Sequence, residues 1–156
     1  MAVWQVDFYV VPRQAIGSQP LTRAALNQTQ WWANARFPND YRTRLAAVAP
    51  PAPSSSAQLE TWGDDATNRV DVWSATGRVE RVTARVDVRR LDSKFGAALI
   101  AFARTAQAVF VRDDGLVVEP TIAAYAGALR SSSAWRYASD PAAFLAAHDV
   151  NDDSAE

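Results

Sequence analysis

Apolar and polar side chains alternate between residues 69 and 89, and this pattern restricts the fold more than any other feature of the sequence. A period of two is typical of β-strands with one buried face. The segment therefore predicts an antiparallel hairpin with a three-residue loop, 75–77, in which Gly77 takes the left-handed conformation. The apolar positions of the two strands are Val70, Val72, Val82, Ala84, Val86 and Val88.

The length of that loop sets the register of the hairpin. It places Val70 opposite Val82 in the core, and Asp71 opposite Arg81 on the other face, where they would attract each other. The apolar positions change parity in the middle of the second strand. We therefore expect a β-bulge at Glu80 or Arg81.

The rest of the chain predicts three more strand segments and five helices. Alternating polar and apolar side chains indicate the strands, and turn residues and helix-capping residues mark the ends of the elements. The expected strands are residues 4–10, 59–62 and a hairpin, 109–119, around Asp113-Asp114-Gly115. The expected helices are residues 20–34, with Trp31 and Trp32 on it, 41–48, 93–107, 121–130 and a last one that starts at Asp140-Pro141 and carries Phe144.

The order of these elements favours an α+β fold with a mostly antiparallel sheet and helices on one face. Its larger elements follow the βαββαβ order of a ferredoxin-like core, with an extra C-terminal hairpin and helices. We expect one domain over residues 1–148, which includes a Pro/Ser-rich loop at 50–57, and a flexible acidic tail at 149–156.

Composition excludes several kinds of chemistry. The chain has 156 residues, a formal charge of −1, no cysteine and a single histidine, His148. Thiol catalysis, disulfides and Cys-ligated metals are therefore ruled out, and histidine-rich metal sites and Ser-His-Asp triads lack their residues. We predict no catalytic residue, metal or cofactor. No signal peptide or membrane-length apolar segment is present, so we expect a soluble cytoplasmic protein.

The candidate binding site is the sheet face opposite the valines. If helices cover only the other face, this one exposes aromatic and arginine side chains, which are enriched in protein-binding hot spots. The alternative is a solvated face of cross-strand ion pairs, with its aromatic residues partly covered by the Pro/Ser-rich loop. The predicted binding residues are Tyr9, Trp73, Arg81, Arg85, Asp87 and Arg89.

Three functions fit these observations. The first is a non-catalytic protein-binding module, immunity-like or regulatory, whose partner is another protein or a second copy. The second is a small-molecule-binding or enzymatic domain with a cavity between the Pro/Ser-rich loop and the sheet, near Trp62, Trp73 and Tyr9. The third is binding of single-stranded RNA, since residues 69–90 carry six arginines and three acids. A near-neutral chain makes nucleic acid the least favoured partner and argues against membrane binding.

Several strand and turn motifs, with the alanine- and arginine-rich composition, resemble a loose group of small uncharacterised bacterial proteins. The resemblance covers the C-terminal 90 residues and implies a shared fold without an activity. The opening segment, 4–9, is similar to the start of a chloroplast and cyanobacterial RNA-binding family. The motifs of the bacterial group are at residues 68–73, 77–79, 85–89, 119–121 and 140–145.

Overall fold

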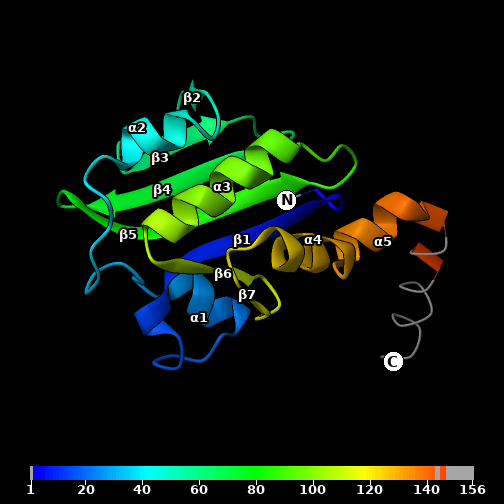
Figure 1. Cartoon of the computed structure of the whole chain (residues 1–156), viewed down its shortest axis with the longest axis horizontal. Helices are drawn as coiled ribbons and strands as arrows, with labels where there is room; N and C mark the ends of the chain where they lie inside the picture. The colour runs from blue at the N-terminus through cyan, green and yellow to red at the C-terminus, as the bar shows by residue number, and fades with distance from the viewer. Residues whose placement is uncertain (1, 143–144, 147–156) are drawn as a thin grey trace.

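Seven strands form one open antiparallel sheet in the computed structural model, which describes residues 2–142, 145 and 146 (Figure 1). The expected α+β class with an antiparallel sheet is confirmed. The strand order is β2-β3-β4-β5-β1-β6-β7. The strands are β1 (Gln5–Pro12), β2 (Pro51–Ala52), β3 (Leu59–Gly63), β4 (Arg69–Ala75), β5 (Arg78–Asp87), β6 (Ala108–Arg112) and β7 (Val117–Val118).

Four of the helices, α1, α3, α4 and α5, begin at side chains that cap them. The hydroxyls of Thr22, Thr121 and Ser132 and the carboxylate of Asp92 each accept backbone N–H groups of the following first turn. The longest helix among the described residues has 13 residues, and none could cross a membrane. The helices are η1 (Arg13–Ala15, 3-10), α1 (Arg23–Gln28), α2 (Tyr41–Ala46), α3 (Ser93–Thr105), α4 (Ile122–Arg130) and α5 (Ser133–Ser139).

The core lies between the sheet and the helices α2, α3 and α4, which cover what we call the front face (Figure 1). Phe8 of β1 contacts Phe110 of β6 and Tyr125 of α4, and Phe37 contacts Phe102 of α3. The valines of the central hairpin point to this side and are almost fully buried. Burial of these apolar side chains is the main stabilising contribution to the fold.

The expected βαββαβ core is present as four neighbouring strands, in the order β4-β5-β1-β6. Helix α3 follows β5 and leads to β6, so the chain crosses over β1 on the front face. β2 and β3 extend one edge of this core, and β7 extends the other. The Pro/Ser-rich segment therefore contributes an edge strand, since Pro51 and Ala52 pair with β3.

The predicted register of the central hairpin is wrong by two residues. Val70 lies opposite Ala84, and Asp71 lies opposite Thr83. The loop has two residues, because Thr76 and Gly77 both have positive φ, 51° and 75°. Two left-handed residues make the tight turn whose twist matches that of the strands. A threonine in this conformation is uncommon, so the sequence did not indicate the shorter loop.

The predicted bulge is confirmed. Trp73 pairs with Arg81 and Ser74 pairs with Val79, so Glu80 has no partner on β4. The extra residue restores the parity of the apolar side chains on both sides of it. The backbone carbonyl of Glu80 accepts the N–H of Trp32 at 3.1 Å, which joins the bulge to the segment after α1.

One helix prediction needs correction, and one helix was not predicted. The first helix ends at Gln28, so Trp31 and Trp32 lie in turns, where they are buried and donate their indole N–H groups to the carbonyls of Leu26 and Val10. The helix expected to start at Asp140-Pro141 is present, since residues 141, 142, 145 and 146 are helical. Helix α5, which precedes it, was not expected. Phe144, His148 and the tail at 149–156 lie outside the described residues.

Candidate interaction surface on the back of the sheet

The back face of the sheet is divided into a covered half and an open half. Helix α1 lies over the β1 and β6 side, since Asn27 accepts hydrogen bonds from the Tyr9 hydroxyl and from Arg81. The side chains of Val109 and Val111 point to this side and are buried. The expectation of helices on one face thus holds for α2, α3 and α4, whereas α1 is on the other.

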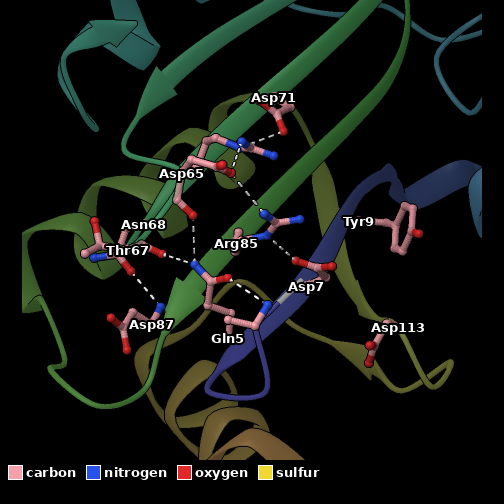
Figure 2. A network of polar contacts seen from close by, with 12 residues as sticks. Gln5, Asp7, Tyr9, Asp65, Thr67, Asn68, Asp71, Arg85, Asp87 and Asp113 are labelled. Carbon is pink, nitrogen blue, oxygen red and sulfur yellow. Dashed lines mark hydrogen bonds and ion pairs between the residues drawn. The ribbon is translucent and has the colours of Figure 1, made fainter.

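A row of ion pairs crosses the open half, where the register places Arg85 between Asp7 and Arg69. Arg85 donates from Nε to Asp7 at 3.1 Å and from Nη1 to Asp65 at 3.3 Å (Figure 2). Arg69 pairs with Asp65 and, at 3.0 Å, with Asp71. Every charge in this row therefore has an opposite charge beside it.

Two amide side chains hold the loop between β3 and β4 against the sheet. The Gln5 amide donates to the backbone carbonyls of Asp65 at 3.2 Å and Thr67 at 2.9 Å (Figure 2). The Asn68 carbonyl oxygen accepts the backbone N–H of Asp87 at 2.8 Å. These bonds fix Asp65 above the ion-pair row, although it is distant in sequence from Asp7 and Arg85.

Asp87 and Arg89 form a separate pair at the end of β5. Asp87 is 3% exposed and accepts hydrogen bonds from the backbone and the guanidinium of Arg89, at 2.8 to 3.1 Å. Burial acts to raise the pKa of Asp87, but the bonds from Arg89 outweigh it and the pKa is lowered. Arg89 also stacks on Trp4, 4.1 Å from the ring centroid. Asp87 is therefore buried and engaged, whereas the paired Arg89 side chain remains 46% exposed.

Tyr9 is likewise engaged, because it is 6% exposed and its hydroxyl donates to Asn27. Burial and the nearby carboxylate of Asp7 raise the pKa of Tyr9, so the phenol stays protonated. Tyr9 therefore belongs to the packing beneath α1.

The accessible part of the open half is a cross-strand row next to the ion pairs. Leu59, Trp73 and Arg81 are paired neighbours on β3, β4 and β5, and all three are partly exposed. The Arg81 guanidinium lies 5.3 Å from the Trp73 ring centroid, within cation–π range. With the partly exposed Thr83, these residues form what we call the back-face patch.

The six residues predicted as one site thus separate into three groups. Trp73 and Arg81 are in the back-face patch, Arg85 is in the ion-pair row, and the other three are packed or paired elsewhere. Sequence reasoning missed Asn27 and Asp65, whose signals were only those of a helix end and a turn. No three or more acidic or histidine side chains in the described chain gather as metal ligands would.

Comparison with known proteins finds no matching family model, no matching curated protein and no matching solved structure.

Proposed function

We propose that this protein is a non-catalytic binding module that recognises another protein through the back-face patch. The observation that carries the proposal is the uncovered row of Leu59, Trp73 and Arg81 on a sheet whose other face is fully covered by helices. Tryptophan and arginine contribute most of the binding energy in many protein interfaces. The partly exposed Trp73 offers an apolar surface with a charged neighbour.

Charge pairing favours a protein over RNA as the partner. Binding of nucleic acids depends on an excess of positive charge that replaces counterions. Here Arg69 and Arg85 are neutralised by Asp7, Asp65 and Asp71. Three of the six arginines of the expected basic strip, Arg69, Arg85 and Arg89, are therefore paired with carboxylates, and the ion-pair row beside Trp73 is neutralised.

The small-molecule alternative is supported less well by the cavity beside the Pro/Ser-rich segment. A cavity of about 290 Å³ does lie beside the Pro/Ser-rich segment, with Ala57, Glu60 and Ser74 among its lining residues. Trp62, Trp73 and Tyr9, the residues expected to line such a site, are not among them. The open sheet face therefore supports the binding-module proposal better.

A bacterial cytoplasmic setting is part of this proposal. The cysteine-free composition fits a reducing compartment. In an immunity-like or regulatory role, this chain would bind another cytoplasmic protein and block or modulate its activity. A second copy of the same chain is the alternative occupant of the patch.

Photo-crosslinking tests the proposal. A photoreactive phenylalanine analogue in place of Trp73 should capture a discrete partner, whereas the same analogue in place of Ile122, which is 73% exposed on α4, should not. Trp73→Ala should weaken binding of the captured partner about tenfold or more. Unchanged affinity of a folded Trp73→Ala variant would overturn the proposal, and a covalent homodimer would show that the occupant is a second copy.

A further inference from the structure

A groove of about 670 Å³ lies at the end of the sheet where β1 terminates, away from the back-face patch. It runs between η1, the segment after α1, the end of α3 and the start of α4. Polar lining residues come from all four of these segments: Arg13, Arg36, Arg104, Gln107, Glu119 and Thr121. The volume is typical of sites for small molecules.

The charges in this groove are unbalanced. Three guanidinium groups face a single carboxylate, that of Glu119, which Arg13 binds through both of its terminal nitrogens at 2.9 and 2.6 Å. Arg104 uses only Nε, which donates to the Pro120 carbonyl at 2.9 Å. Arg36 is exposed and makes no ion pair with any described residue.

The start of α4 lies at the same groove. Thr121, which lines it, caps the helix by accepting the N–H of Ala124. The backbone N–H groups of Ile122 and Ala123 have no hydrogen-bond acceptor within the helix, as is true of the first N–H groups of any helix. The positive end of the nine-residue helix dipole therefore adds to the field of the three arginines.

We propose that this groove binds a small phosphate monoester. Its phosphate would be held by the terminal nitrogens of Arg36 and Arg104, because planar guanidinium groups match the spacing of phosphate oxygens. The rest of the ligand would lie on the apolar part of the lining, which includes Pro12, Ala35 and Pro120. Arg13 becomes a third donor when the ligand displaces Glu119.

Because of the position of Glu119, the proposal predicts that different substitutions change the binding affinity in opposite directions. Glu119 occupies Arg13 and repels an entering phosphate, so Glu119→Gln should tighten binding. Arg36→Gln and Arg104→Gln should weaken it, since each removes a charge-assisted hydrogen bond. Damage to the fold alone would weaken binding in all three variants and could not produce opposite effects.

Titration of the ¹⁵N-labelled full chain with phenyl phosphate, at constant ionic strength, tests the inference. We expect saturable shifts of the Gln107 and Ile122 amide signals, about tenfold weaker binding in Arg36→Gln and Arg104→Gln, and several-fold tighter binding in Glu119→Gln. Arg90→Gln is the matched control and should bind as the wild type does. Shifts that do not saturate, or unchanged affinity in the Arg36 and Glu119 variants, would overturn the proposal.

Discussion

Two groups of arginines in this protein differ in whether carboxylates accompany them. In the ion-pair row of the back face, Arg69 and Arg85 are each 21% exposed and each contact two aspartates. In the groove, Arg36 is exposed without an ion pair to a described residue, and among the described residues Arg104 forms a hydrogen bond to a backbone carbonyl and no ion pair. The same residue type therefore stabilises the sheet in one place and is available to an anion in the other.

The largest effect should come from removing the carboxylate of Asp71. This side chain is 10% exposed, accepts the Thr61 hydroxyl at 2.8 Å and pairs with Arg69. Asp71→Ala leaves a buried hydroxyl and a half-buried cation with fewer partners, so we expect unfolding in urea to show a loss of about 2–3 kcal/mol. Asp71→Asn, which keeps an acceptor for Thr61, should lose less. Equal losses would mean that the charge alone matters.

Arg85 should have a smaller effect because it is more exposed than Asp71. We expect Arg85→Gln to reduce the free energy of unfolding by about 1–2 kcal/mol. A double-mutant cycle with Asp7→Asn isolates the pair itself, and its coupling energy should be about 1 kcal/mol. A coupling energy near zero would show that the row is solvated and contributes nothing to stability.

Acid should weaken the paired region through Asp87. Because Arg89 lowers the pKa of Asp87 in the folded protein, this pair contributes stability above the ordinary carboxyl pKa of 3.8, and the contribution is lost as pH falls through the lower folded value. Asp87→Asn should therefore flatten the decline of stability below about pH 4. Denaturation midpoints between pH 2.5 and 6 measure this slope.

The matched change in the groove is Glu119→Gln. Arg13 lowers the pKa of Glu119 by hydrogen bonding, but both side chains are more than half exposed. Solvent screens such a pair, so the acid dependence should change less than in Asp87→Asn. An equal or larger change would remove the distinction between the two regions.

The smallest effect on stability is expected from Arg36→Gln. An exposed side chain without an ion pair contributes little to folding, so thermal and urea unfolding should agree with the wild type within about 0.5 kcal/mol. A larger loss of unfolding free energy would mean that Arg36 stabilises the fold, as Arg69 and Arg85 do on the back face.

Local features of the fold were predictable. The alternation of residues 69–89 correctly indicated two strands, their buried face and the bulge at Glu80. Two helix starts were also found to within one residue, since the helices expected over 93–107 and 121–130 begin at Ser93 and Ile122. The register was predicted wrongly for two reasons. The loop is one residue shorter than expected, because Thr76 adopts a positive φ that threonine disfavours, and the bulge at Glu80 shifts the pairing by one more residue.

The candidate sites depended on contacts between distant segments. Parity placed Trp73 and Arg81 on the correct face, but it could not show that α1 would cover Tyr9 on that face. The groove arginines are separated by more than 20 and more than 60 residues along the chain. No short motif joins them, so sequence reasoning did not select them.

The sequence by itself determined which side chains face the core, where the helix after Asp92 begins, and that thiol and histidine-rich chemistry lacks its residues. These properties follow from periodicity, capping and composition, which act over a few residues or over the whole chain. Only the tertiary structure decided which arginines are neutralised. That outcome depends on whether folding brings a carboxylate such as Asp65 within about 4 Å of a guanidinium, and charge interactions at this range are set by the fold.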